Sequence, residues 1–290
     1  MGIVKRAIAK DASVVSMAID ATDIVARIEE IHGTSAVATA ALGRLAVATS
    51  LMGYTLKNDG DSVTCRIDAD GALGQLVAVS DSSGNVKAYV QNPIVEISLN
   101  ENGKLDVGGA VGEGTLTVIK DMGLKEPYVG VCPLVSGEVA EDFAAYYANS
   151  EQTPTVCSLG VLVSPDLKVK AAGGFLIHVL PFASEECIDV IERNIADIPP
   201  VTEMLNGGMT PAEIALKLLD GLEPNELDEG EVAYKCTCSR ERTEQILAGV
   251  GRKELGEMIS EGKDVEICCH FCGKKYVFTI ENIRDVINEN

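Results

Sequence analysis

Five of the nine cysteines lie in the C-terminal tail, in two closely spaced groups. The first group is Cys236-Thr-Cys238, and the second, about thirty residues later, is Cys268-Cys269-His-Phe-Cys272. Zinc accepts four thiolates in a tetrahedron, so two thiol pairs separated by enough chain to fold back meet its requirement. A site of this kind supplies much of the folding energy of a small domain. The spacing therefore predicts a zinc-binding tail.

The second group offers more donors than a pair requires. Either Cys268 or Cys269 could act with Cys272, and His270 lies between two thiols. The two-residue gap from Cys269 is the usual spacing of a zinc knuckle, so we predict Cys236, Cys238, Cys269 and Cys272 as the ligands. Spacing alone is also compatible with a purely structural zinc ribbon.

The residues around the second group predict a β-hairpin with the thiols at its turn. Asp264–Ile267 leads into the turn and Lys275–Thr279 leads out of it. Gly273 follows the last cysteine and permits the tight turn that directs backbone N–H groups at sulfur. A short helix is expected after Ser239 and another over Lys253–Ile259.

Upstream, the segment Ser35–Leu56 is a long run of Ala, Leu, Val and Thr. Its length raises the question of a membrane span. Arg44 lies near its centre, where insertion into lipid would cost about 3 kcal/mol. We therefore expect a helix buried in a protein core, and no membrane association.

The remaining pattern predicts an α+β fold. Residues 13–31 have helical spacing, and short alternating runs typical of strands follow from Ser62 onward. These runs are Ser62–Asp68, Gly74–Ser80, Asn85–Gln91, Ile94–Leu99, Gly114–Lys120, Tyr128–Val131, Val156–Val163 and Gly174–Leu180, with a helix over Glu138–Ser150. We expect antiparallel sheets packed on the long buried helix in a core domain of residues 1–180.

After Pro181 the sequence pattern changes to that of helices separated by short polar segments. Helices are expected over Ser184–Ala196 and Thr210–Leu219, the second begun by a Thr-Pro-x-Glu capping pattern. The segment Leu219–Val232 carries six acids and no base, which is typical of a linker with little stability of its own. The predicted division is therefore a helical and acidic linker over 181–232 and a zinc-binding domain over 233–290.

Net charge and the distribution of cysteines indicate the cellular compartment and the class of binding partner. The formal net charge of −20 repels phosphate backbones and disfavours nucleic acid as a partner. The first residues contain no long apolar segment, so we expect no signal peptide and a cytoplasmic protein. Outside the tail, Cys65, Cys132, Cys157 and Cys187 stand singly among apolar neighbours and are expected to be buried.

No catalytic constellation is evident elsewhere. His32 and His178 have no nucleophile and orienting acid at a recognisable spacing, and the glycine-rich stretch 108–114 lacks the spacing of a phosphate-binding loop. We therefore expect no enzyme. The alternative is a thiol–disulfide oxidoreductase with a zinc-ribbon tail, but such enzymes normally place the thiol pair at a helix start beside a βαβ unit.

The sequence resembles the thirty-three-kilodalton chaperonin family of bacteria, the redox-regulated heat-shock holdases, over nearly its whole length. In the tail the resemblance rests on Cys236-x-Cys238-Ser-Arg-Glu-Arg and Cys269-x-x-Cys272. Upstream it rests on His32-Gly33-Thr34, Ala40-Ala41-Leu42-Gly43-Arg44, Asn92-Pro93, Gly103-Lys104-Leu105-Asp106-Val107, Val135-Ser136-Gly137-Glu138, Ser150-Glu151-Gln152 and Ala172-Gly173-Gly174-Phe175.

The resemblance implies an ATP-independent chaperone of oxidative and heat stress. One Zn²⁺ is held by the four cysteines in the reduced, inactive state. Oxidants form the disulfides Cys236–Cys238 and Cys269–Cys272, zinc leaves, and the tail and linker unfold. The active protein is a homodimer that binds unfolding clients and passes them to ATP-dependent foldases. Cys268, a fifth thiol beside a ligand position, departs from the family pattern.

Overall fold

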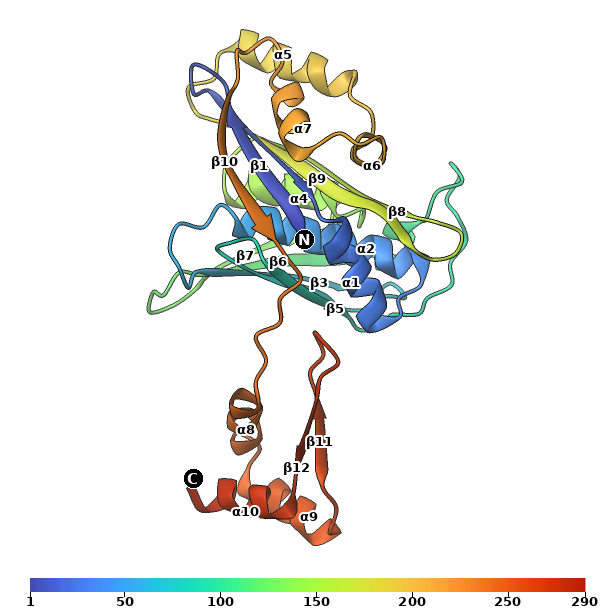
Figure 1. Ribbon diagram of the computed structural model, residues 1–290, viewed down its shortest axis with the longest axis vertical. Coiled ribbons are helices and arrows are strands. Elements are labelled where there is room, and N and C mark those ends of the chain that lie inside the picture. The colour runs from blue at the N-terminus through green and yellow to red at the C-terminus, as the bar shows by residue number, and fades with distance from the viewer. Residues whose placement is uncertain (290) are drawn as a thin grey trace. The chain divides into compact units, whose positions relative to one another are not determined.

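The computed structural model describes residues 1–289. The chain divides into two compact units, which begin at Met1 and Cys236. Each unit has its own hydrophobic core. Figure 1 shows the elements of both units. The predicted boundary between a core domain and a linker near residue 180 lies inside the first unit, and that division stays a prediction.

The first unit contains two five-stranded sheets in which every neighbouring pair is antiparallel. The first sheet has the order β10 (Asn225–Val232), β1 (Gly2–Ile8), β2 (Val14–Asp20), β9 (Val169–Val179) and β8 (Thr155–Val163). The second has the order β5 (Val86–Val90), β4 (Leu76–Asp81), β3 (Ser62–Ala69), β6 (Gly114–Asp121) and β7 (Tyr128–Pro133).

Helix α2 (Ala36–Gly53) packs on strands of both sheets and forms the centre of the larger core (Figure 1). Within residues 1–289 it is the one helix long and apolar enough to cross a membrane, and 89% of that window is buried inside the protein. Its small residues allow close packing, because a Cβ at Gly43 would lie 2.8 Å from side-chain atoms of Val25 and Val161. The prediction of a buried core helix is confirmed.

Three shorter helices complete the larger core: α1 (Thr22–His32), α3 (Val107–Val111) and α4 (Ala140–Ser150). The start of α4 is built around the buried carboxylate of Asp142. Its Oδ1 accepts N–H groups of Val135 and Ser136 at 2.7 and 3.1 Å, and its Oδ2 accepts that of Val139 at 2.9 Å. These bonds hold Val139 at a φ of 71°, a backbone region that a β-branched residue rarely adopts.

Replacing Asp142 with asparagine is therefore expected to destabilise the first unit by about 1–3 kcal/mol, because an amide turns one acceptor into a donor that faces backbone N–H groups. The neighbouring substitution Glu141→Gln is the control, since Glu141 is exposed. Urea unfolding followed by circular dichroism measures both. Equal midpoints for the two variants would show that the carboxylate does not hold this turn.

Helices α6 (Val201–Asn206) and α7 (Pro211–Leu218) pack on one face of the first sheet, and α5 (Glu185–Ala196) packs on α7; together they form a second core. The sheet and the turn after β1 contribute Ala7, Ala9, Val14, Ala18, Phe175 and Ile177, and most of the other buried members come from the helices. The predicted capping box of α7 is present, with Thr210 and Glu213 bonded to each other's backbone N–H. The α+β fold is confirmed.

Two predictions of local structure are wrong. Residues 13–31 form strand β2 followed by α1, because the Asp20 carboxylate accepts the N–H and hydroxyl of Thr22 and ends the strand there. Ile94–Leu99 is not a strand, and its Ile94 side chain is 73% exposed. The Ser35 hydroxyl accepts the Val95 N–H, so backbone groups there serve the start of α2 instead of a sheet.

The acidic end of the linker also differs from the expectation. Residues 225–232 form the edge strand β10, which pairs with β1, although six of its eight side chains are exposed. Backbone pairing and charges on β1, rather than apolar burial, hold this strand.

The second unit contains α8 (Arg240–Ala248), α9 (Arg252–Glu261), the hairpin β11 (Val265–Cys268) and β12 (Lys275–Phe278), and α10 (Ile280–Glu289). Among its described residues, the core has six buried side chains: Leu247, Leu255, Tyr276, Phe278, Ile283 and Val286. A core this small supplies little stability.

Candidate metal centre

The four predicted ligands converge in the second unit. Cys236 and Cys238 precede α8, whereas Cys269 and Cys272 lie in the turn between β11 and β12. All four Sγ atoms lie within 4.8 Å of one another. The Cys236–Cys269 and Cys238–Cys272 sulfurs are 3.7 and 3.4 Å apart.

These separations fit a tetrahedral zinc site. A Zn–S bond of about 2.3 Å places the sulfurs of a regular tetrahedron about 3.8 Å apart. The two sulfur–sulfur distances are near that edge length and well above the length of a disulfide bond, which is about 2.05 Å. All nine cysteines are free thiols. The donor set and its spacing are therefore those of a four-thiolate metal centre.

The knuckle at the turn has the predicted form. The Gly273 N–H donates to the Cys269 carbonyl at 2.8 Å, and the Cys269 N–H donates to the Lys274 carbonyl at 2.9 Å. Gly273 has a φ of 70°, a left-handed conformation that glycine adopts without strain. The short hairpin thereby brings two thiols to one side of the turn.

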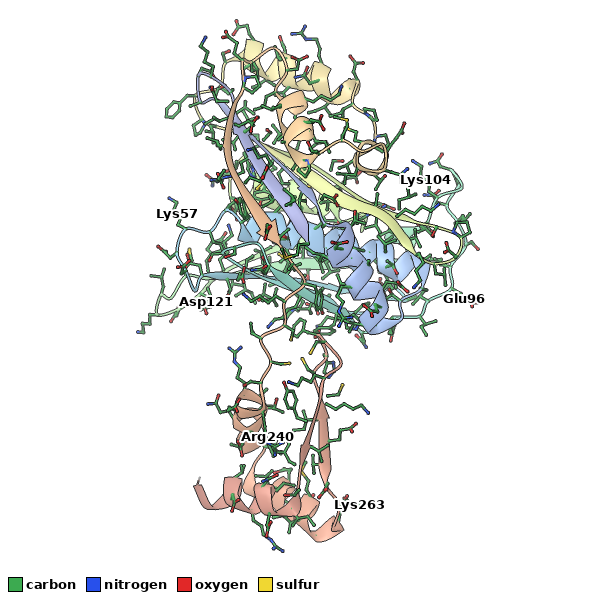
Figure 2. The ribbon with its side chains drawn as sticks, in the orientation of Figure 1. Lys57, Glu96, Lys104, Asp121, Arg240 and Lys263 are labelled. Carbon is green, nitrogen blue, oxygen red and sulfur yellow. The ribbon has the colours of Figure 1, made fainter. Side chains whose placement is uncertain are left out.

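Two arginines that follow the first thiol pair hold that pair in position. The Arg242 guanidinium donates to the Thr237 hydroxyl at 3.1 Å, between the two cysteines. Arg240, labelled in Figure 2, donates to the Val277 carbonyl at 2.8 Å and lies over the Phe278 ring. The start of α8 is thus tied to β12, which carries the chain away from the other two thiols.

Tyr276 also belongs to the site, although no motif in the sequence indicates it. Its hydroxyl donates to the Cys238 sulfur at 3.1 Å, and Lys274 lies over its ring. An outer hydrogen bond of this kind orients a metal-binding sulfur. The alternation of β12 carried a signal, because Tyr276 and Phe278 occupy the buried positions of that strand.

The thiols differ in their acidity. Burial raises the pKa of Cys272 to about 12 and also raises that of Cys236. Burial acts in the same direction on Cys238, but hydrogen bonds from Tyr276 and the neighbouring thiols outweigh it and lower that pKa to about 7. Binding a cation must therefore release protons from Cys236 and Cys272, so metal affinity rises with pH.

Two neighbouring donors lie outside the cluster. Neither Cys268 nor His270 belongs to the group of four among the described residues. The Cys268 side chain is exposed, and its sulfur lies 3.5 Å from the Gly273 carbonyl oxygen.

The four cysteines outside the tail have the surroundings of inert thiols. Cys65, Cys132 and Cys187 are buried, and Cys157 is half-buried. Burial raises the pKa of the Cys65 thiol to about 12, and it also raises that of Cys157. Thiols held protonated in this way react slowly with oxidants.

His178 lies in β9, as predicted, and its Nδ1 is 2.9 Å from the Thr155 hydroxyl.

The sequence matches the family profile described as "Hsp33 protein" over residues 3–279. It is 50% identical to the 33 kDa chaperonin of Clostridioides difficile over 260 residues, which is 89% of either chain. It is 45% identical to the 33 kDa chaperonin of Alkaliphilus metalliredigens over 98% of both. The crystal structure of the 33 kDa chaperonin of Thermotoga maritima superposes with a TM-score of 0.91 at 35% identity, covering 99% of this chain and 98% of that one.

Proposed function

The chain belongs to the Hsp33 family, and on this premise we propose that it is a redox-regulated, ATP-independent holdase switched by its four-cysteine tail. The observation that carries the proposal is the convergence of four thiols within 4.8 Å on a module with six buried side chains in its described part. Hsp33 chaperonins are holdases without enzymatic activity, so the oxidoreductase alternative is not supported.

In the reduced state Cys236, Cys238, Cys269 and Cys272 hold one zinc ion. When bound, zinc keeps the four sulfurs as thiolates and contributes about 10–16 kcal/mol in modules of this size. Tyr276 orients one of the sulfurs, and the Arg240 and Arg242 contacts keep the first pair beside the second.

A peroxide oxidises the site in two equivalent steps. In each step two thiolates lose two electrons and form one disulfide, and the peroxide takes those electrons with two protons to give two waters. We assign the pairs as Cys236–Cys238 and Cys269–Cys272, which rests on the family resemblance, because the closest sulfurs here are those of the crosswise pairs. Four sulfurs in disulfides no longer bind zinc, and the tail loses its largest source of stability.

The transition then extends to the linker, residues 181–232, beside the core domain, residues 1–180. Helices α5 to α7 cover one apolar face of the first sheet. When they undock, Phe175, Ile177 and Val14 become accessible, and an exposed apolar surface of this kind binds unfolded chains. The active form is a cytoplasmic homodimer that retains clients until ATP-dependent foldases receive them.

The test measures zinc, thiols and chaperone activity on the same samples. We expect peroxide with mild heat to release one zinc per chain, to consume four thiols and to suppress aggregation of a denatured client. Reduced, zinc-loaded protein is the control and should suppress little. Full zinc release without any gain in aggregation suppression would refute the switch.

The same samples decide the disulfide pairing. Trypsin cleaves after lysine and arginine, so it separates residues 236–240 from residues 264–274. Pairing within each thiol group leaves two separate peptides, each lighter by two hydrogens, with Cys268 still open to alkylation. Crosswise pairing would instead link the two peptides until a reductant is added.

A further inference from the structure

The edge strand β10 is attached to β1 by opposite charges on both faces of the sheet. On one face the Lys5 ammonium lies 2.7 Å from a carboxylate oxygen of Glu226 and 3.9 Å from one of Glu229. On the other face the Arg6 Nε donates to Asp228 at 2.8 Å. Every acid named here belongs to the linker and every cation to β1.

Charge pairing continues beyond the strand ends. Lys10 lies 2.6 Å from a carboxylate oxygen of Glu223, and its N–H donates to the Leu222 carbonyl at 3.1 Å. Three cations within six residues of β1 and the following turn therefore face the acidic linker. In a chain with a net charge of −20, this is a concentrated basic edge.

Apolar burial contributes little to the attachment. Of the eight residues in β10, Val232 is buried, Gly230 is half-buried and the others are exposed. Exposed ion pairs contribute about 0–1 kcal/mol each. Lys5 is the exception, because its side chain is only 9% exposed and needs an acidic partner. The strand is therefore held by backbone pairing and charge, which another acidic strand can reproduce.

Tyr54 restricts which strands can pair with this edge, because its ring leaves room only for glycine at the position of Gly230 unless the ring moves. The Tyr54 ring lies against Gly230, where a Cβ would come within 2.6 Å of ring atom Cε2. The Arg6 guanidinium lies 5.8 Å from the centre of the same ring and also donates to Asp228. Other acids near the edge already have partners, since Asp11 accepts from Ser13 and Asp20 accepts from Thr22.

We propose that the β1 edge, once β10 has left it, binds extended acidic segments of unfolding client proteins by strand addition. This inference rests on the proposed function, because oxidation is what frees β10. Main-chain hydrogen bonds supply affinity, and Lys5, Arg6 and Lys10 select for carboxylates. In the reduced state the tethered β10 occupies the edge at a high effective concentration and excludes clients.

The probe is a fluorescent peptide with the sequence of residues 222–232, compared with a peptide in which its five acids are replaced by amides. Fluorescence anisotropy measures binding to reduced and to oxidised protein. We expect the oxidised protein to bind the acidic peptide at least about tenfold more tightly than the amide peptide, with a preference that weakens as salt rises. Reduced protein should bind neither.

The variant Lys5→Gln/Arg6→Gln should lose this preference when oxidised. Arg27→Gln is the matched control, because Arg27 pairs with Glu30 on α1 and should keep the preference. Equal affinity of oxidised protein for the two peptides would overturn the proposal, as would an unchanged preference in the double variant.

A second variant separates this inference from the redox mechanism. Glu226→Gln/Asp228→Asn/Glu229→Gln removes the acids that hold β10, so the reduced, zinc-loaded variant should bind the acidic peptide without oxidation. If this reduced variant binds the acidic peptide but the oxidised, unaltered protein has no holdase activity, the redox switch is rejected and peptide binding by the β1 edge is retained. If the oxidised, unaltered protein has holdase activity but neither it nor the reduced triple variant prefers the acidic peptide, only the proposal for the β1 edge is rejected.

Discussion

Replacing Cys269 with serine is expected to weaken zinc binding at least about 100-fold, whereas replacing the adjacent Cys268 leaves the affinity unchanged. In small structural zinc modules the metal contributes about 10–16 kcal/mol, so losing one of four sulfurs is expected to remove about 3 kcal/mol or more, which corresponds to a factor of about 100. Cys269 belongs to the cluster of four sulfurs, whereas Cys268 is exposed and lies outside it. Competition with a chromophoric chelator measures both affinities.

The pair is a matched comparison, because the two substitutions are chemically identical and one residue apart. Circular dichroism should show that the Cys269→Ser tail has lost helix under conditions in which the Cys268→Ser tail keeps it, since the described core of this unit has only six side chains. Equal zinc affinities would mean that Cys268 replaces its neighbour, and that the knuckle begins one residue earlier.

The turn that carries Cys269 and Cys272 could be predicted because its information is local. A gap of two residues and a following glycine determine the turn, and the structure places Cys269, Cys272 and Gly273 in that geometry. The hydrogen bond from Tyr276 to Cys238 could not be predicted in the same way. It joins residues 38 positions apart, and only the path of the chain between them brings them together.

In the fold, too, features set by local sequence could be predicted, and features set by contacts between distant residues could not. Alternation located most strands, and the length and composition of α2 indicated its burial. Strand β10 was missed because a run of acids has low strand propensity, and its stability depends on Lys5 and Arg6, more than 200 residues earlier. Ile94–Leu99 has the alternation of a strand, but its backbone is engaged at the start of α2.

The second prediction with a large expected effect concerns the packing of the linker helices in the second core. Ile191→Ala is expected to make the reduced, zinc-loaded protein a partly active holdase, whereas Ile188→Ala leaves it inactive. Both residues lie on α5, but Ile191 is 2% exposed in the second core and Ile188 is 38% exposed. Removing a buried isoleucine side chain costs about 2–5 kcal/mol, so undocking of the linker should become at least about 30-fold more frequent.

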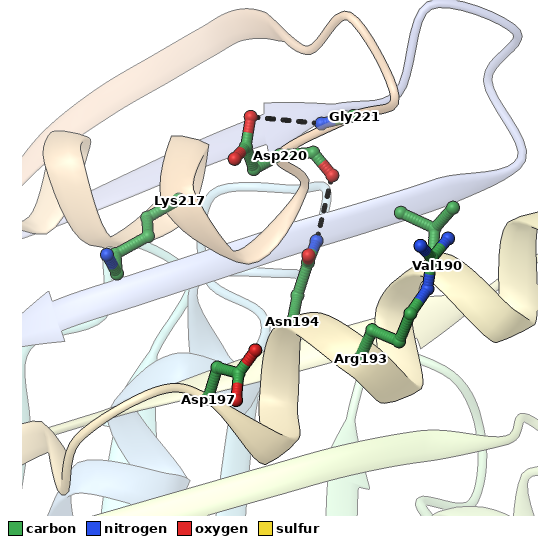
Figure 3. A pocket seen from close by; sticks show the side chains of 7 residues that line it. All are labelled: Val190, Arg193, Asn194, Asp197, Lys217, Asp220 and Gly221. Carbon is green, nitrogen blue, oxygen red and sulfur yellow. Dashed lines mark hydrogen bonds between the residues drawn. The ribbon is translucent and has the colours of Figure 1, made fainter.

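Polar contacts also join α5 to the end of α7. Figure 3 shows Asn194, whose side-chain N–H group donates to the carbonyl of Asp220 at 2.9 Å, in a hollow also lined by Arg193 and Lys217. The same group lies 3.1 Å from the Leu218 carbonyl. Such exposed bonds contribute about 1 kcal/mol, which is less than the loss at Ile191.

Hydrogen exchange distinguishes linker release from general unfolding. The first sheet takes part in two cores, and the one around α2 contains no residue of α5 to α7. In Ile191→Ala, amides of residues 184–219 should therefore exchange faster while those of α2 stay protected, and aggregation suppression should rise in parallel. Faster exchange in α2 as well would mean that the second core is required for the whole unit, and that the linker cannot open while the sheet stays folded.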